Sequence, residues 1–169
     1  MPQYSQAFVC ILNSSRELIF NRNCLSVAFG RKMSPPERVD LSGTWKMVHV
    51  ENFDAYLQAL GIGFVLRAIA KMLSNTQIIE QDGDSFYVKD INTLQTHEVT
   101  FQIGVPVEGT TVIGKYRVTV TWDGDVLRGH TETDKGIIRT ERYIQEDGTM
   151  LYSMTAPNGV KTTQIFVKQ

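Results

Sequence analysis

Hydrophobic and polar residues alternate along most of the chain, and this period of two dominates everything after residue 75. Alternation of this kind predicts β-strands that bury one face. A first strand is expected around Trp45, with Trp45, Met47 and His49 on one face. The later strands are expected at Gln77–Glu80, Ser85–Asp90, Glu98–Ile103, Thr110–Ile113, Lys115–Trp122, Val126–Thr131, Ile137–Ile144, Met150–Thr155 and Lys161–Lys168.

Tight turns join these strands. Asp-Gly or Asn-Gly pairs are strong hairpin signals, and they occur at 82–83, 123–124, 147–148 and 158–159. About ten strands linked in this way are most economically arranged as an antiparallel barrel, because closure removes the unpaired edges of a sheet. We therefore predict an all-β fold, a ten-stranded antiparallel up-and-down β-barrel of the clam type.

One segment, between the first and second strands, has a helical period instead. Asn52 is expected to cap a short helix, and Gly61 and Gly63 separate it from a second one. The apolar positions of the first helix are Phe53, Tyr56, Leu57 and Leu60, and those of the second are Phe64, Leu66, Ile69, Ala70 and Leu73. The two helices are predicted to form a lid over one end of the barrel. A barrel of about ten strands encloses more space than side chains fill, so we expect a ligand cavity.

Composition narrows the function. The net charge of −1 favours neither nucleic acid nor an anionic membrane as a partner. No run of residues approaches the roughly 18 apolar positions that span a bilayer. Both cysteines, Cys10 and Cys24, precede the strands, which excludes a disulfide framework, a zinc site or a catalytic cysteine within the barrel. Asp-Gly-Asp triplets resemble calcium loops but lack the alternating oxygen ligands and the distal Glu, so we predict no metal site.

Residues 1–39 differ from the rest and are predicted to be an N-terminal extension to a domain at residues 40–169. Residues 1–32 hold four basic residues and one acidic residue, a net charge of +3, together with several serines. Such a segment is typical of a mitochondrial transit peptide, and the alternatives are a disordered extension or a start of translation at Met33. Pro35 and Pro36 prevent a helix from running into the domain.

The segment GTWKMVHVENFDAYLQALG, at residues 43–61, resembles the N-terminal signature of the intracellular lipid-binding proteins, the family of fatty-acid-binding and cellular retinoid-binding proteins. The resemblance continues through RAIAKML, IIEQDGDSF, TFQIG, VTVTWDGDVL and TTQIFVKQ. It implies a non-enzymatic, monomeric, cytoplasmic carrier of a hydrophobic ligand that needs no cofactor. A rival is a lipocalin-type enzyme, but the domain has neither a cysteine nucleophile nor a recognisable Ser-His-Asp arrangement.

The last strand favours the cellular retinol-binding branch of this family. Carboxylate-binding members have Arg-x-Tyr there, whereas this chain has Gln164 and Phe166, as the retinol branch does. A neutral Gln can exchange hydrogen bonds with an alcohol or aldehyde but cannot offset a buried carboxylate. Retinol or a related retinoid is therefore the expected ligand.

Three departures from that branch keep an alternative open. Gln77 replaces a Lys of the branch, and Leu94-Gln95-Thr96 replaces an aromatic-Arg-Asn motif at the portal. The position of a second Gln of the branch falls on Thr140, Glu141 or Arg142. If Arg142 faces inward, a fatty acid or retinoic acid becomes the alternative ligand, with Arg142 as its carboxylate anchor.

The resemblance also implies ligand contacts on the barrel wall and at the lid. Phe101 and Val99 are expected to face inward, with core filling as the alternative. Contacts at the portal are expected from Phe53, Leu57, Leu66, Ile69 and Leu94, which could instead only dock the helices. Trp45 is expected to close the far end of the barrel. The lid is expected to make transient contact with membranes or enzymes, where Arg67 and Lys71 either steer it or form a solvated face.

Overall fold

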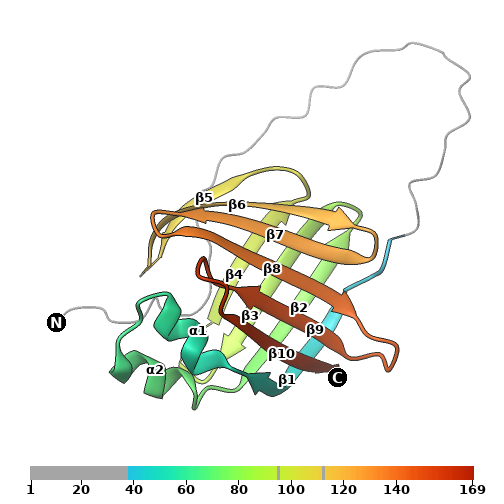
Figure 1. Cartoon of the computed structure of the whole chain (residues 1–169). Helices are drawn as coiled ribbons and strands as arrows, with labels where there is room; N and C mark the ends of the chain where they lie inside the picture. Colours follow the sequence, from blue (N-terminus) through green and yellow to red (C-terminus); the bar gives the residue numbers. More distant parts are fainter. Residues whose placement is uncertain (1–37, 95, 112) are drawn as a thin grey trace, which may run out of the picture.

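A computed structural model of the chain describes residues 38–169 except residues 95 and 112, so the predicted extension lies almost wholly outside the described residues (Figure 1). The helices are α1 (Phe53–Ala59) and α2 (Phe64–Ala70). The strands are β1 (Gly43–Glu51), β2 (Asn75–Asp82), β3 (Ser85–Asn92), β4 (Thr96–Gln102), β5 (Val107–Thr111), β6 (Gly114–Asp123), β7 (Val126–Thr133), β8 (Gly136–Ile144), β9 (Met150–Thr155) and β10 (Lys161–Lys168).

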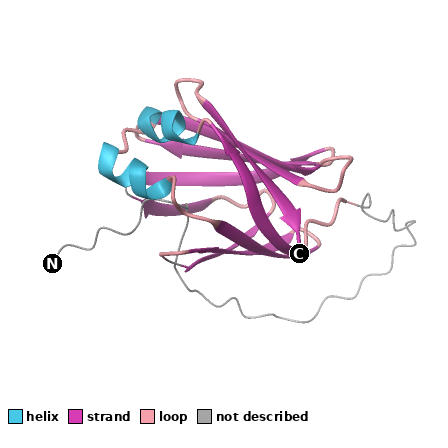
Figure 2. Ribbon diagram, turned by 90° about the horizontal axis from the view of Figure 1, so that it is seen from below, coloured by secondary structure: helices cyan, strands magenta, loops and turns pink. Residues whose placement is uncertain are grey.

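The ten strands form one antiparallel sheet that curls into a nearly closed barrel (Figure 1). Strands that follow each other in sequence pair with each other, except β4 and β5, and β1 pairs with β10 to bring the two ends of the domain together. The edges of the sheet are β4 and β5. Both helices follow β1 and lie together at one end of the barrel (Figure 2). The predicted all-β clam with its two-helix lid is confirmed.

Two local predictions are wrong. The fifth strand was expected at Thr110–Ile113 but runs over Val107–Thr111, because the tight turn into β6 begins where the apolar pattern still continues. Asn52 precedes α1 in the left-handed region, with φ of 55°, and its side chain does not cap the helix. Its amide nitrogen instead donates to the Lys161 carbonyl at 2.8 Å, which ties the start of the lid to β10.

The predicted hairpin glycines occupy positions that require their conformational freedom. Gly83 and Gly124 both have φ of 58°, and each begins a two-residue connection. Asp82 pairs with Ser85 across the first of these turns, and Asp123 pairs with Val126 across the second. Left-handed backbone favours glycine, so these two positions fix the register of the strands on either side.

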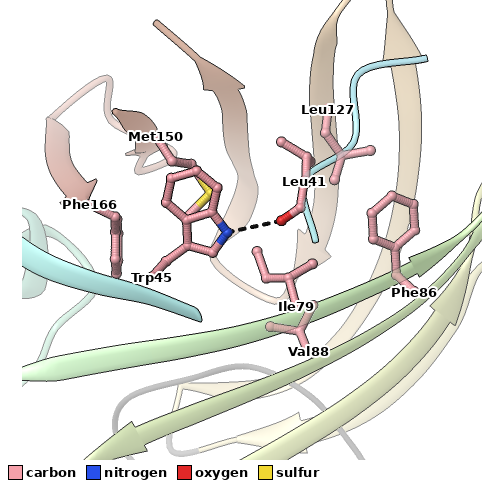
Figure 3. Packing of buried hydrophobic residues seen from close by; sticks show 8 residues of the cluster. All are labelled: Leu41, Trp45, Ile79, Phe86, Val88, Leu127, Met150 and Phe166. Carbon is pink, nitrogen blue, oxygen red and sulfur yellow. Dashed lines mark hydrogen bonds between the residues drawn. The ribbon is translucent and has the colours of Figure 1, made fainter. Parts of the chain in front are cut away.

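An apolar cluster closes the barrel at the end away from the helices. Trp45 is 2% exposed, and its indole nitrogen donates to the Leu41 carbonyl at 2.9 Å (Figure 3). The other buried members are Ile79, Phe86, Val88, Leu127, Met150 and Phe166. A second cluster packs the lid onto the barrel and contains Tyr56, Leu57, Leu60, Ile62, Ala70, Ile138 and Ala156. The expected structural role of Trp45 agrees with this packing.

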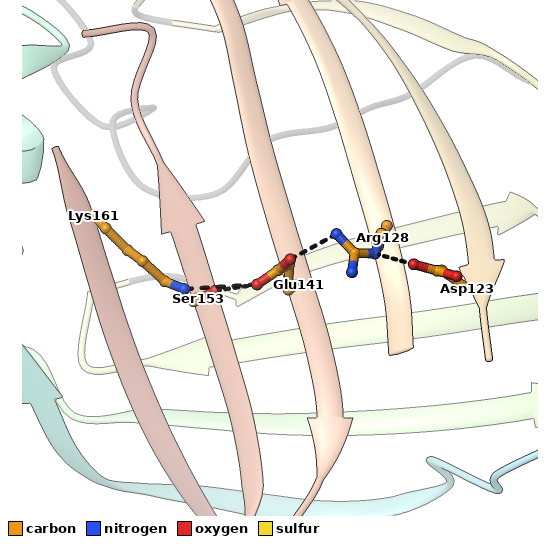
Figure 4. Close-up of polar contacts among 5 residues, drawn as sticks. All are labelled: Asp123, Arg128, Glu141, Ser153 and Lys161. Carbon is orange, nitrogen blue, oxygen red and sulfur yellow. Dashed lines mark hydrogen bonds and ion pairs between the residues drawn. The ribbon is translucent and has the colours of Figure 1, made fainter. Parts of the chain in front are cut away.

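The outer face of the barrel carries a row of charged and polar side chains across β6 to β10 (Figure 4). Arg128 pairs with Asp123 at 2.9 Å and with Glu141 at 2.8 Å. Glu141 also lies 3.6 Å from Lys161 and accepts from the Ser153 hydroxyl at 3.5 Å. Since these pairs are largely exposed, each contributes little to stability.

Candidate functional site

A cavity of about 680 Å³ lies inside the barrel between the two apolar clusters. A volume of this size suits a ligand of 20 or so heavy atoms. Most of its wall is apolar, including Met47, Val99, Val118, Val120 and Met154. Charged and amide side chains interrupt this wall on two sides, so the cavity has two distinct polar groups of residues.

The first polar group lies on β8, β9 and β10. Arg142 pairs in register with Tyr152, and Tyr152 pairs with Gln164, so the three side chains form one row across the sheet. All three line the cavity. Arg142 is only 8% exposed, and its guanidinium carbon lies 4.5 Å from the centre of the Tyr152 ring. This row presents hydrogen-bond donors and a positive charge to the interior.

The second polar group lies on β2 and β3. Asp90 is 3% exposed and pairs in register with Gln77, which is equally buried. The carboxylate oxygen Oδ1 of Asp90 accepts from Gln77 Nε2 at 2.7 Å and from Asn75 Nδ2 at 3.4 Å. All three residues line the cavity. The interior therefore holds an acidic side chain, Asp90, as well as a basic one, Arg142.

The two polar groups interact electrostatically, although no ion pair joins them. Burial raises the pKa of Asp90, and the positive charge of Arg142 and the amide hydrogen bonds of Gln77 and Asn75 oppose that rise. Among the described residues, no ion pair includes either Asp90 or Arg142. Arg142 is thus partly offset by an acid inside the same cavity, although it makes no salt bridge.

The register of β8 resolves which of its residues faces inward. Thr140 and Arg142 line the cavity. Glu141 points to the outer face, where it pairs with Arg128 (Figure 4). Arg142 therefore faces the cavity, as the alternative with Arg142 as a carboxylate anchor requires.

Seven of the predicted ligand contacts lie on the cavity wall: Phe53, Leu57, Gln77, Val99, Phe101, Arg142 and Gln164. Phe101 stacks on Phe86, with ring centres 5.0 Å apart. Four others do not line the cavity. Phe166 is fully buried in the cluster around Trp45, Leu66 packs within the lid cluster, and Leu94 and Ile69 are exposed near the lid end.

Two polar residues of the wall, Asp90 and Asn75, were missed at the level of sequence. A signal for Asp90 existed, because Phe86, Val88 and Asp90 alternate along one strand, and the first two are buried. An acid that continues an apolar inward face is expensive to bury and marks a specific role. Asn75 lies at the first position of β2, where the pattern carries no such signal.

Ion pairs and one hydrogen bond from a distant part of the chain organise the lid. Asp54 on α1 pairs with Arg67 on α2 at 3.2 Å and with Lys71 at 3.8 Å. Lys135, in the turn between β7 and β8, donates to the Leu60 carbonyl at 2.7 Å. The outer side of α2 and the turn after it are apolar, with Phe64 75% and Met72 84% exposed. The two cations thus hold the helices together, and the exposed surface beside them is hydrophobic.

Two other features are absent from the part of the chain that the structure describes. No helix there is long and apolar enough to cross a membrane. No group of three or more His, Cys, Asp or Glu side chains there could hold a metal ion.

Comparison with known proteins places this cavity in a family. The model of the lipocalin / cytosolic fatty-acid binding protein family matches residues 42–151. Retinol-binding protein 1 of Rattus norvegicus is 35% identical over 133 residues, which are 77% of this chain and 97% of that protein. Retinoid-binding protein 7 of Mus musculus is 41% identical over 91 residues, 52% of this chain and 68% of that protein.

Solved structures agree. Human cRBP IV has a TM-score of 0.72 and 32% identity, covering 78% of this chain and 99% of that one. The REP1-NXSQ fatty acid transporter has a TM-score of 0.70 and 32% identity, covering 76% and 96%. A capped ten-stranded barrel, an internal cavity and a matching family model lead to one conclusion: this chain belongs to the lipocalin / cytosolic fatty-acid binding protein family.

Proposed function

We propose that the protein is a cytoplasmic, monomeric, non-catalytic carrier that holds one retinol or related retinoid inside the barrel. The observation that carries this proposal is the largely apolar cavity of about 680 Å³ with buried polar side chains on its wall. Each 100 Å² of apolar ligand surface removed from water contributes about 2.5 kcal/mol before ordering costs. Burial of the hydrocarbon chain of the ligand supplies most of the affinity, and the polar side chains on the cavity wall determine which head group binds.

The internal charges favour a neutral head group. Arg142 alone would attract an anion, but Asp90 lines the same cavity and carries the opposite charge when ionised. A ligand carboxylate would gain from Arg142 and be repelled by Asp90. Gln164 adds a neutral amide that can exchange hydrogen bonds with a hydroxyl. The relatives support this choice, since retinol-binding and retinoid-binding proteins are among them.

A carrier of fatty acid or retinoic acid is the second candidate, because Arg142 faces the cavity and forms no ion pair with a described residue. In this alternative Arg142 anchors the carboxylate, and Asp90 binds a proton as the acid enters. The similarity to a fatty acid transporter structure favours it. The two candidates differ in head group and share the fold, the cavity and the lid.

A competitive displacement assay separates them. The full-length protein is loaded with a fluorescent fatty-acid analogue and titrated at pH 7 with all-trans-retinol, all-trans-retinoic acid and oleic acid. Retinol is expected to compete at least about tenfold better than either acid, a difference of about 1.4 kcal/mol. A tenfold preference for an acid supports the second candidate. Failure of all three to bind contradicts a lipid carrier of either kind.

Delivery is expected to use the lid. The exposed Phe64 and Met72 on and beside α2 offer an apolar surface to a membrane or an acceptor enzyme. A Phe64→Ser/Met72→Ser variant should transfer retinol to phosphatidylcholine vesicles several-fold more slowly without losing affinity. Val48→Ser is the matched control, because Val48 is also exposed but lies on β1. Equal transfer by all three proteins would show that the lid surface is not used.

A further inference from the structure

Asn75, Gln77 and Asp90 form an acceptor cluster on the cavity wall. Both amides donate to the same carboxylate oxygen, Oδ1 of Asp90. The other oxygens remain without donors: Asn75 Oδ1 and Gln77 Oε1 are buried and accept no hydrogen bond in the described part of the chain. Neither hydrogen bond to Asp90 uses its Oδ2. The cluster thus has two buried oxygens without a donor and a third oxygen, Asp90 Oδ2, that neither amide engages.

Acceptors buried in this way are costly. A buried polar atom without a partner loses about 1–3 kcal/mol relative to one that is hydrogen-bonded. The amides of Asn75 and Gln77 are held in place by their hydrogen bonds to Asp90, so their unpaired oxygens cannot turn to solvent to recover that loss. The missing component is a hydrogen-bond donor that comes from the cavity.

The opposite polar group cannot supply that donor directly, because Arg142 forms no ion pair with Asp90 or any other described acid. Arg142 and Gln164 instead offer their own donors to whatever occupies the cavity. These donors serve any ligand oxygen, whether it belongs to an aldehyde, an ether or an alcohol. The acceptor cluster serves only a ligand that carries a proton on its oxygen.

We propose that the acceptor cluster of Asn75, Gln77 and Asp90 binds the hydroxyl proton of the ligand and thereby selects a primary alcohol over the aldehyde or ether of the same hydrocarbon chain. Asp90 receives the hydrogen bond through Oδ2, and Gln77 and Asn75 are positioning residues that hold the carboxylate through Oδ1. This inference rests on the proposed carrier function and adds to it the residue that recognises the head group.

A ligand series on the unmodified full-length protein is the first test. All-trans-retinol, all-trans-retinal and retinyl methyl ether share one hydrocarbon chain. Only the oxygen of retinol carries a proton that can be donated in a hydrogen bond. Retinol should bind at least about tenfold more tightly than the other two, because only retinol fills the cluster. Binding of all three within threefold of one another overturns the inference and leaves the carrier function intact. No binding by any of them contradicts the carrier function itself.

The second test converts the acceptor into a donor. Asp90→Asn keeps an oxygen for Gln77 and turns an amide group toward the cavity, so the preference for retinol should fall below threefold or reverse. Glu80→Gln removes an exposed carboxylate on β2 and should leave the preference unchanged. If Asp90→Asn retains the full tenfold preference, Asp90 is not the acceptor. Should that variant not fold, Gln77→Leu tests the same cluster and should also weaken the preference.

Discussion

Asp90 on β3 and Arg142 on β8 face one cavity with opposite charges and make no salt bridge with each other. Their strands are five places apart in the sheet, so each charge belongs to a different side of the barrel. Both side chains are almost completely buried. Each buried charge therefore keeps a desolvation cost that no direct partner among the described residues offsets. In the proposed carrier, the head group of the ligand enters between the two side chains.

Removal of the positive charge of Arg142 should change the ligand preference of the protein more than its stability. Arg142→Gln deletes the positive charge that an acidic ligand needs, so the affinity for oleic and retinoic acid should fall by about 10- to 100-fold. The affinity for retinol should change less than threefold, because an amide still donates to a hydroxyl. Displacement titrations with the three ligands measure both effects.

Arg139→Gln is the control for that experiment, since Arg139 is an exposed residue of the same strand. Arg139→Gln should alter neither the affinity for oleic and retinoic acid nor the affinity for retinol. An equal loss of acid and alcohol binding in Arg142→Gln would mean that Arg142 shapes the cavity rather than selecting the charge of its ligand.

Asp90 should make the stability of the empty protein depend on pH. Burial raises its pKa above the ordinary value of 3.8, so the folded protein binds this proton more tightly than the unfolded chain. As pH rises from about 3.8 through the folded pKa, the native protein therefore loses stability at this site. Asp90→Asn has no such titration, and its free energy of unfolding relative to the native protein should increase from pH 4 to pH 8.

Urea denaturation of the two proteins across that pH range measures the difference. Other carboxylates contribute equally to both and cancel. Glu80→Gln, which removes an exposed carboxylate, should show no comparable trend. A constant difference between Asp90→Asn and the native protein would mean that Asp90 is as easily ionised in the fold as in the unfolded chain.

Sequence patterns predicted the barrel well because each of its constraints is local. Strand alternation, four turn dipeptides and the helical period at 52–73 each depend on residues close in the chain. The ends of β5 were missed because the tight turn into β6 begins where the apolar pattern still continues. The conformation of Asn52 was missed because its partner lies elsewhere in the chain. The Asn52 amide is engaged by Lys161, more than 100 residues away in the chain.

The site was harder to predict because it depends on register. Arg142 faces inward only because β8 pairs with β9 as Arg142–Tyr152, and a shift of one residue would put Glu141 in the cavity. Phe166 has the same inward parity as Gln164 on β10, yet it lies in the packed cluster beyond the cavity. Depth along the barrel axis is a tertiary property, and alternation says nothing about it.

The cluster around Trp45 should contribute stability without affecting the ligand. Trp45→Phe removes the bond from the indole to the Leu41 carbonyl and leaves a small void, at a cost of about 1–3 kcal/mol in the free energy of unfolding (Figure 3). Trp45 is not part of the cavity wall, so the affinity for retinol should stay within twofold. Urea denaturation and a ligand titration on the same sample test both statements.

Val48→Ala serves as the comparison, because Val48 is an exposed residue of the same strand and should cost less than about 0.5 kcal/mol. A large loss of retinol affinity in Trp45→Phe, with little loss of stability, would place Trp45 in contact with the ligand.

Lys135 should govern how quickly the lid opens. Its ammonium group donates to the Leu60 carbonyl at the end of α1, and this bond joins the lid to the turn between β7 and β8. Lys135→Met removes that bond but keeps the length of the side chain, so the lid should open more often. Because the lysine is partly exposed, we expect retinol to dissociate about three- to tenfold faster. Stopped-flow transfer of retinol to excess vesicles measures the rate.

Lys115→Met is the control, because Lys115 lies on the exposed face of β6, and it should leave the rate of retinol dissociation unchanged. An unchanged rate in Lys135→Met would mean that ligand leaves by a path that does not displace α1. The gap between the edge strands β4 and β5 would then be the route to test.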